Sequence, residues 1–370
     1  MLMLKKHTLA YFCSSKSWGG LEMNQLRNAK WMSERGHEVC ILAQKNSKID
    51  YEAKALGIHV EYILPHKKYL DVFAAFRLAQ KIKNLNVTHL IVRDPKDMSV
   101  CGLAKRLSFR KFALAYFMEM QIGIPKRDFV HTMRYNAFDC WVCPLPWLQK
   151  QVLEMTRYPK EKTHIIPSGI ELDKFFEAIP SDQAKATLDL DVNKKYIGLA
   201  GRYDPQKGQM LLLEAFNKIK NEVDYNVVFL GEPTHGEYAD YIDWLKEFVR
   251  ANSLQGRVHF RSFRDDVETF YAAIDVFVMG TKAETFGMVT IEAMASGCKI
   301  VGSNKGGTVE ILDYGRLGEL YESGNGADLA DKLMRAIQNQ NFDSEYLKNE
   351  ARKYDANRVS EQVESLFQYL

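Results

Sequence analysis

The sequence predicts an α/β protein built from two doubly wound parallel-sheet domains in series. The chain has 370 residues, whereas a single hydrophobic core stops growing at roughly 250 to 300 residues. Short apolar runs alternate with longer segments of helical periodicity, which is the pattern of parallel βαβ units. The alternation stops once, in a polar and acidic stretch, and then starts again. We therefore expect two domains, each with its own sheet.

In the first half, seven short runs rich in apolar, β-branched and aromatic residues predict strands. They cover residues 8–14, 38–43, 59–63, 89–93, 113–118, 140–143 and 164–166. Between them, apolar residues recur at i, i+3 and i+4, which is the spacing of one helix face. This spacing predicts helices over residues 21–35, 70–85, 96–107 and 147–155.

The second half repeats the alternation. Its predicted strands are 196–200, 226–230, 258–261, 276–279, 299–302 and 319–321, and its predicted helices are 208–220, 238–252, 265–273, 287–296 and 329–339. Residues 171–195 are polar and acidic without a strand, so we expect a linker there. Ligands of open α/β sheets lie beyond the carboxyl ends of the strands, and the crevice between two such domains is the expected site.

The near-neutral charge of the whole chain hides two opposed halves. The formal net charge is +3, but residues 1–170 hold 27 Lys and Arg against 14 Asp and Glu, a net +13. The remainder holds 23 against 33, a net −10. Such a split indicates an anionic surface or partner for the first half. The alternative is that these basic residues only solvate one face.

The N-terminal segment and the cysteines bear on the compartment. The apolar run over residues 8–13 is too short for a secretory signal, and no window approaches the ~18 apolar residues of a membrane span. Six cysteines in this length suggest no disulfide framework. Cys140 and Cys143 form a C-x-x-C pair that better fits a buried strand than a metal or redox site. We expect a cytoplasmic protein.

Two short loops could approach an anion, although the G-x-G-x-x-G and P-loop patterns are both absent. Gly19 and Gly20 precede a predicted helix, where glycine permits close approach of backbone N–H groups to an anion; they could equally form a plain tight turn. Arg202 and Lys207 lie between a predicted strand and helix. A guanidinium fork and an ammonium there could clamp a diphosphate, or form a solvated loop.

Glu284 and Glu292 place two carboxylates eight residues apart around a predicted helix start. A wholly helical offset would span roughly 12 Å, too far for the paired carboxylates of a glycoside hydrolase, at about 5 to 9.5 Å. It suits two ends of one extended polar ligand, with Gly287 freeing N–H groups for a phosphate. The alternative is an acidic residue favoured by the helix dipole and an unrelated surface Glu.

The order of these motifs resembles the retaining glycosyltransferases of family 4, which have the GT-B fold: two Rossmann-like domains facing a cleft. The resemblance rests on Gly19–Gly20, on Arg202 and Lys207, on the E-x7-E of Glu284 and Glu292, and on Gly306–Gly307 with Glu310. It covers nearly the whole chain. It implies an acceptor domain over residues 1–170, a nucleotide-sugar domain over 171–350, and a C-terminal helix, 351–370, packing back on the first domain.

The resemblance also implies roles for single residues. Arg202 and Lys207 would hold the donor diphosphate, Glu292 the ribose and Glu284 the donor sugar. The donor-binding residues would further include Gly19, Gly20, Phe286, Gly287, Met288 and Val289, the backbone around Phe286 and Gly287 meeting the phosphates. No metal would be needed, because cations and helix N-termini stabilise the leaving group. The D-x-D at residues 189–191 is only a superficial likeness to metal-dependent transferases.

One position departs from the family pattern. Relatives usually carry a histidine at the end of the strand predicted over 113–118, and Glu119 occupies that place here. Glu119 could contact a sugar hydroxyl or stabilise positive charge at the anomeric centre. It could also be structural, while His131 or another group serves.

A basic and apolar segment predicts where an anionic membrane would meet the first half. Lys105, Arg106, Arg110 and Lys111 are interspersed with Leu103, Leu107, Phe109, Phe112 and Leu114, a mixture that suits an interfacial segment. Relatives often dock their acceptor domain on membranes. The stacking aromatics or recognition helix of a nucleic-acid-binding protein are missing.

The resemblance, taken with these residues, implies a metal-independent retaining hexosyltransferase, which we expect to be cytoplasmic and peripheral on the inner face of the membrane. We expect a nucleotide diphosphate sugar as donor, UDP favoured over GDP. The expected acceptor is a cell-envelope glycan or lipid-linked molecule such as a lipopolysaccharide or capsule precursor. The alternatives are a sugar-nucleotide epimerase or phosphorylase on the same fold, and a non-enzymatic sugar-nucleotide-binding protein.

Overall fold

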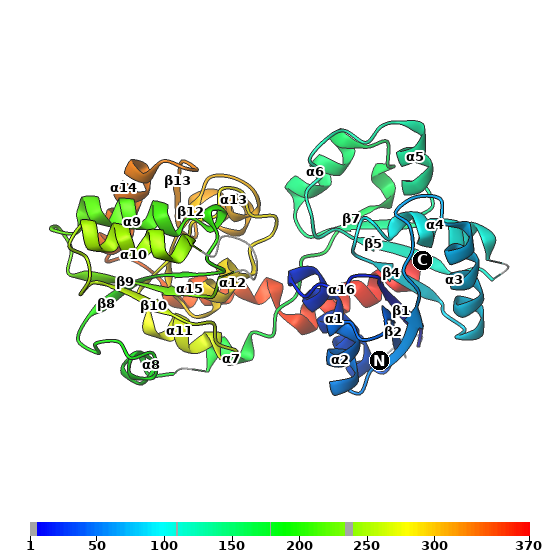
Figure 1. The fold of residues 1–370 in the computed structure, drawn as a ribbon, viewed down its shortest axis with the longest axis horizontal. Coiled ribbons are helices and arrows are strands. Elements are labelled where there is room, and N and C mark those ends of the chain that lie inside the picture. Colours follow the sequence, from blue (N-terminus) through cyan, green and yellow to red (C-terminus); the bar gives the residue numbers. More distant parts are fainter. Residues whose placement is uncertain (1–5, 109, 178, 234–239) are drawn as a thin grey trace. The chain divides into compact units, whose positions relative to one another are not determined.

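The computed structural model describes residues 6–108, 110–177, 179–233 and 240–370. The chain forms two compact units (Figure 1). Unit 1 comprises the residues up to Gly169 together with Ala356–Leu370, and unit 2 comprises Ile170–Asp355. Each unit is a parallel sheet with helices on both faces.

Unit 1 contains a seven-stranded sheet of order β3-β2-β1-β4-β5-β6-β7, and every neighbouring pair is parallel. The strands are β1 Thr8–Cys13, β2 Glu38–Gln44, β3 His59–Ile63, β4 His89–Val92, β5 Ala113–Phe117, β6 Cys140–Cys143 and β7 Thr163–Ile165. The strand order reverses between β1 and β4, and such a switch point is where the loops at the carboxyl ends diverge and leave room for a ligand.

Helices cover both faces of this sheet, because each face is apolar and must be shielded from water. They are α1 Gly20–Glu34, α2 Lys48–Ala55, α3 Val72–Asn84, α4 Met98–Leu107, α5 Phe129–Tyr135, α6 Pro146–Met155 and α16 Ala356–Tyr369. One core lies on the side of α3 and α4. The other lies on the side of α1, where Val359, Val363 and Phe367 of α16 join it. The C-terminal helix is therefore part of the unit 1 core.

Unit 2 repeats the plan with a six-stranded parallel sheet of order β10-β9-β8-β11-β12-β13. Its strands are β8 Lys195–Ala200, β9 Tyr225–Leu230, β10 Val258–Arg261, β11 Val276–Met279, β12 Lys299–Ser303 and β13 Glu319–Tyr321. Its helices are α7 Asp173–Phe176, α8 Ser181–Thr187, α9 Gln209–Ile219, α10 Tyr241–Ala251, α11 Val267–Ala273, α12 Met288–Ala295, α13 Gly307–Ile311, α14 Gly326–Gln338 and α15 Ser344–Ala351. Its switch point lies between β8 and β11.

Each predicted strand has a counterpart in the sheets, within one or two residues at its ends. The helices α2 and α5 were not predicted, because each is short and buries few apolar side chains. The predicted helix over 238–252 is α10, and residues 238 and 239 lie outside the described residues. The segment expected as a linker instead folds into α7 and α8, and buries Leu172 and Phe175 in unit 2.

Candidate active site

In unit 2 the loop after β8 carries two cations. A short 3-10 turn, Pro205–Lys207, begins where the Asp204 carboxylate accepts a hydrogen bond from the Gln206 amide at 2.8 Å. The Arg202 carbonyl accepts from the Gln209 side chain at 2.8 Å. The exposed Arg202 guanidinium makes no ion pair or hydrogen bond with any described residue. These two hydrogen bonds fix the backbone of the loop and leave the Arg202 side chain available to a ligand.

Lys207 reaches the loop that follows β11. Its Nζ lies 3.3 Å from Oε2 of Glu284, and both side chains are partly exposed. The structure therefore joins two of the predicted site residues, which are 77 positions apart in sequence. Because β8 and β11 are neighbours in the sheet, their carboxyl ends bring these loops to one edge.

Gly306 allows the backbone of the loop after β12 to contact the backbone of the Glu284 loop. The Gly307 amide donates to the Glu284 carbonyl at 2.8 Å. Gly306 has φ 70° and ψ −154°, a combination that essentially only glycine adopts. A Cβ at Gly306 would lie 2.3 Å from that same carbonyl oxygen. The backbone contact therefore requires glycine, and it sets the position of Glu284.

Helix α12 and the two residues before it contain the remaining predicted donor-site residues of unit 2. Gly287 is its N-cap with φ 100°, so the glutamate pair is only partly joined by helix and the 12 Å estimate, which assumed a wholly helical offset, does not apply. Phe286 is buried and its ring packs on Tyr354. Its side chain is therefore structural, and only its backbone remains for a ligand. Met288 and Val289, in the first turn, are half-buried.

Glu292 is held by a tyrosine that the sequence reasoning missed. The Tyr271 hydroxyl on α11 donates to Oε2 of Glu292 at 2.8 Å and lies 3.2 Å from the Val289 carbonyl. Burial raises the pKa of Tyr271 well above its ordinary value, and Glu292 adds to the rise. Tyr271 therefore stays a neutral donor that orients one carboxylate oxygen. No sequence signal marks it, because a buried Tyr on a helix usually belongs to the core.

In unit 1, Glu119 follows β5 and is engaged at both carboxylate oxygens. Arg93, at the end of β4, forms an ion pair with Oε1, and the Asn24 amide of α1 donates to Oε2 at 3.1 Å. The Arg93 guanidinium also lies 4.9 Å from the centre of the Phe117 ring. Burial raises the pKa of Glu119, while Arg93 and Asn24 oppose that rise. Asn24, Arg93, Phe117 and Glu119 all line one pocket.

The Gly19–Gly20 loop begins α1, as expected, but one of its amides is already used. The Glu22 carboxylate accepts from the Gly19 N–H at 3.0 Å, which is the reciprocal half of a capping box. An anion would therefore compete with Glu22 for this amide. His131, the alternative to Glu119, lies on α5 with Nδ1 2.6 Å from Asp128 Oδ2.

A second polar cluster at the carboxyl edge of the unit 1 sheet also escaped the sequence reasoning. Asp97 accepts from the Ser14 hydroxyl at 2.5 Å and lies 3.0 Å from Nε2 of His66. Burial alone would lower the pKa of His66, but the bonds to Asp97 and to the Lys67 carbonyl raise it overall. The cluster ties the loops after β1 and β3 to the start of α4. Its one sequence signal is that each residue follows a strand.

The basic segment at the end of α4 differs from the expected interfacial surface. Lys105 forms an ion pair with Asp139, and the Arg106 and Arg110 guanidinium groups donate to the Met133 carbonyl at 2.9 Å and Asn86 Oδ1 at 2.5 Å. Lys111 is exposed. Phe112 and Leu114, expected at the interface, are buried in the core, and Phe109 lies outside the described residues. These two apolar side chains cannot enter a lipid surface while unit 1 is folded.

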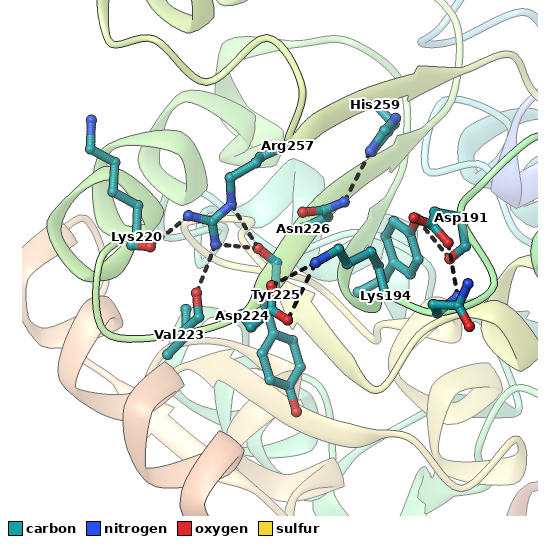
Figure 2. A network of polar contacts seen from close by, with 11 residues as sticks. Asp191, Lys194, Lys220, Val223, Asp224, Tyr225, Asn226, Arg257 and His259 are labelled. Carbon is teal, nitrogen blue, oxygen red and sulfur yellow. Dashed lines mark hydrogen bonds and ion pairs between the residues drawn. The ribbon is translucent and has the colours of Figure 1, made fainter.

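The acidic D-x-D motif lies at the opposite edge of the unit 2 sheet from the cation loop. Figure 2 shows Asp191 near the amino end of β8, where its carbonyl accepts from the Tyr196 hydroxyl and its carboxylate from the Asn193 amide. Arg257 binds the backbone carbonyls of Lys220, Val223 and Tyr225 in the same network. Within the described residues, no group of three or more His, Cys, Asp or Glu side chains could hold a metal ion.

Two family models match the chain almost end to end. One, described as Glycosyltransferase Family 4, matches residues 18–174, and the other, Glycosyl transferases group 1, matches residues 180–354. The chain belongs to the family 4 glycosyltransferases. Both parallel sheets agree with its GT-B fold.

Single relatives are distant. An uncharacterized glycosyltransferase of Methanocaldococcus jannaschii is 24% identical over 90% of this chain and 89% of its own length. A lipopolysaccharide core mannosyltransferase of Rhizobium meliloti is 30% identical over 41% of this chain and 43% of its own. The chain spans about half the length of several curated relatives it matches. The crystal structure of Anabaena HepE in complex with UDP has a TM-score of 0.85 and 21% identity, covering 98% of this chain and all of that one.

No helix among the described residues combines the length and the apolar character that crossing a bilayer requires. All six cysteines are buried and free, Cys140 and Cys143 on β6 included. Burial raises the pKa of each of these two thiols to about 12.

Proposed function

We propose that this glycosyltransferase is a retaining enzyme that takes its sugar from a nucleotide diphosphate sugar, UDP favoured over GDP. The observation that carries the proposal is the edge of the unit 2 sheet, where the Arg202–Lys207 loop meets Glu284 and α12 presents Glu292. HepE structures with UDP, with UDP and glucose, and with UDP-glucose support UDP. Relatives named for lipopolysaccharide synthesis support a cell-envelope or lipid-linked acceptor, such as a lipopolysaccharide or capsule precursor.

The proposed chemistry uses fixed positive charge in place of a metal. Arg202 and Lys207 neutralise the diphosphate as it leaves, together with the N–H groups at the start of α12. The bond between the anomeric carbon and the diphosphate oxygen breaks, and the acceptor oxygen bonds to that carbon on the same face. Because the new bond forms on the face that the diphosphate leaves, configuration is retained, and the acceptor proton passes to a diphosphate oxygen. Glu284 would hold the transferred sugar and Glu292 the ribose.

Two parts of the proposal concern unit 1. Glu119 would contact the sugar near the anomeric carbon, as an ionised carboxylate that Arg93 and Asn24 hold in place. The net charge of +13 on residues 1–170 supports contact with an anionic membrane surface, on the cytoplasmic side.

Thermal unfolding with UDP, GDP, ADP, CMP and their sugars tests the donor. A ligand that binds only the folded state stabilises by about 2.7 kcal/mol at one hundred times its Kd, so UDP should raise Tm by several degrees, unchanged by a chelator. Stabilisation by none of the nucleotides would contradict the proposal. Consumption of UDP-sugar without any acceptor would favour the sugar-nucleotide epimerase or phosphorylase instead.

A further inference from the structure

Unit 1 exposes a group of large apolar side chains that is separate from the basic segment at the end of α4. The group lies on the loop between β3 and α3, on the first turns of α3 and at the start of α5. Phe73 is 82% exposed, Phe129 78% and Leu70 70%. The group also contains Leu64, Tyr69, Val72, Phe76 and Val130. Side chains of this size so far out of the core gain nothing from folding, so they indicate an interaction surface.

Contacts of Tyr69 join the β3–α3 loop to α5. The Tyr69 ring, on the β3–α3 loop, lies 6.4 Å from the ring of His131 on α5. The Arg134 guanidinium of α5 lies 5.5 Å from the centre of the Tyr69 ring. Both helices begin at the carboxyl edge of the sheet, since α3 follows β3 and α5 follows β5. We call this set, with the cations below, the α3–α5 surface.

The charges around it are predominantly positive. Its flanking cations are Lys67, Lys68, Arg77, Lys126 and Arg127. None of the five forms an ion pair with a described residue. The two nearby carboxylates, Asp71 and Asp128, each accept from a backbone N–H of the helix they cap. In the basic segment, by contrast, Lys105 is neutralised by Asp139.

Arg134 adds a cation directly beneath the surface. It is only 8% exposed, and its Nε and Nη2 have no hydrogen-bond partner among the described residues. A guanidinium buried without a counter-charge is costly. It raises the positive potential at Tyr69 and disfavours a second, equally basic copy of unit 1 as the occupant.

We propose that the α3–α5 surface inserts Leu70, Phe73 and Phe129 into an anionic lipid bilayer, with the flanking cations at the headgroups. Apolar side chains ringed by Lys and Arg are the composition that binds such an interface. The inference rests on the membrane contact of the proposed function and relocates it from residues 105–111 to the carboxyl edge of the sheet. That is the edge where ligands of such sheets lie, so a lipid-linked acceptor would enter the site from the bilayer beside it.

Partition of the full chain between buffer and vesicles tests the surface. The vesicles are mixed phosphatidylglycerol–phosphatidylcholine, compared with pure phosphatidylcholine. Each of Phe73→Ser and Phe129→Ser should weaken binding to mixed vesicles about ten-fold, the factor expected from removing one inserted apolar side chain. Lys67→Gln and Lys68→Gln should each weaken it roughly five-fold. The matched control is Trp244→Ser on α10 of unit 2, a residue 64% exposed, which should bind like the unchanged chain.

Each other outcome overturns the inference in a distinguishable way. Unchanged binding of Phe73→Ser/Phe129→Ser, with loss of binding when Lys105, Arg106, Arg110 and Lys111 become Gln, would return the contact to the basic segment. No binding of the unchanged chain to either vesicle would remove the membrane contact while leaving the nucleotide tests intact. Conversion of a dimer to a monomer by the two Phe substitutions, without vesicle binding, would make the surface a self-interface. Equal Tm values for the variants and the unchanged chain would exclude misfolding as the cause of weaker vesicle binding.

Discussion

The two units hold their candidate site residues by opposite means. In unit 2 the backbone positions most of them, because glycine lets the loop after β12 touch the Glu284 carbonyl and a short turn presents Arg202 and Lys207. Glu292, which the Tyr271 hydroxyl holds, is the exception. In unit 1 side chains position them. Asn24 and Glu119 are 95 residues apart and Ser14 and Asp97 are 83 apart. The stability of unit 2 should therefore be sensitive to added side-chain volume at its glycines, and the stability of unit 1 to the removal of charged side chains.

Removal of the Glu119 carboxylate should give the largest effect. Glu119→Ala leaves Arg93, only 5% exposed, without its counter-charge, and breaking a buried pair from one side costs about 3–5 kcal/mol. Urea unfolding followed by circular dichroism should show this loss in the transition of unit 1. The double variant Arg93→Met/Glu119→Met, which removes both charges, should recover much of it. A loss below about 1 kcal/mol would mean that the ion pair does not organise unit 1.

The same position separates a structural from a catalytic role. Glu119→Gln keeps the shape and an acceptor for Asn24 but removes the charge. If Glu119 contacts the sugar, the rate of sugar transfer should fall in Glu119→Gln. The fall should be larger than the loss of folded protein in this variant accounts for. Near-normal turnover in both the Gln and the Ala variant would eliminate the catalytic role.

A methyl group at Gly306 should be nearly as damaging in unit 2. Gly306→Ala combines the overlap at 2.3 Å with the Glu284 carbonyl and a backbone conformation that costs about 1–3 kcal/mol for other residues, so we expect about 3 kcal/mol in all. The matched control is Gly324→Ala, which also has a positive φ of 83° but has nothing within 4 Å of its Cβ position. Equal losses in the two variants would show that the contact with the Glu284 loop contributes nothing.

Loss of the Arg202 guanidinium should affect ligand binding and spare the fold. The side chain is exposed and unpartnered among the described residues, so Arg202→Ala should unfold like the unchanged chain. Its UDP affinity should fall about ten- to one hundred-fold, as expected for a charge-assisted bond worth about 1.5–3 kcal/mol. Titration calorimetry measures this, with Lys246→Ala on the exposed face of α10 as control. Unchanged affinity would place the diphosphate elsewhere.

This contrast also explains what could be predicted from the sequence. Periodicity located the strands because parallel sheets are buried on both faces, and the unit 2 motifs were visible because glycines and charges stand a few residues apart in one loop. The Arg93–Glu119–Asn24 and Ser14–Asp97–His66 groups have no such spacing. Only the sheet order β3-β2-β1-β4-β5 brings their loops together, and strand order cannot be read from local sequence.

The basic segment shows the same limit in another form. A one-dimensional mixture of Lys, Arg, Leu and Phe cannot tell an interfacial helix from the end of a core helix followed by a buried strand. Phe112 and Leu114 belong to the second case. Phe73 and Phe129 also lie near Lys and Arg in the sequence, but their exposure follows only from the packing of α3 and α5.

The smallest expected effect tests how α16 is held to unit 1, and it depends on pH. Glu364 on α16 bonds to Arg35 at 2.7 Å and to His37 at 2.9 Å. Burial would raise the pKa of Glu364, but these two partners lower it overall. Because the folded-state pKa is lowered, the carboxylate stabilises the fold at pH values above its ordinary pKa of 4.5 and loses that contribution as the pH falls below it.

Glu364→Gln should therefore cost about 1–2 kcal/mol at pH 7, and the deficit should shrink toward pH 3. Unfolding free energies across this range measure it, with exposed Glu361→Gln on the same helix as control. A deficit that grows on acidification would show that Glu364 is not held as a carboxylate by Arg35 and His37.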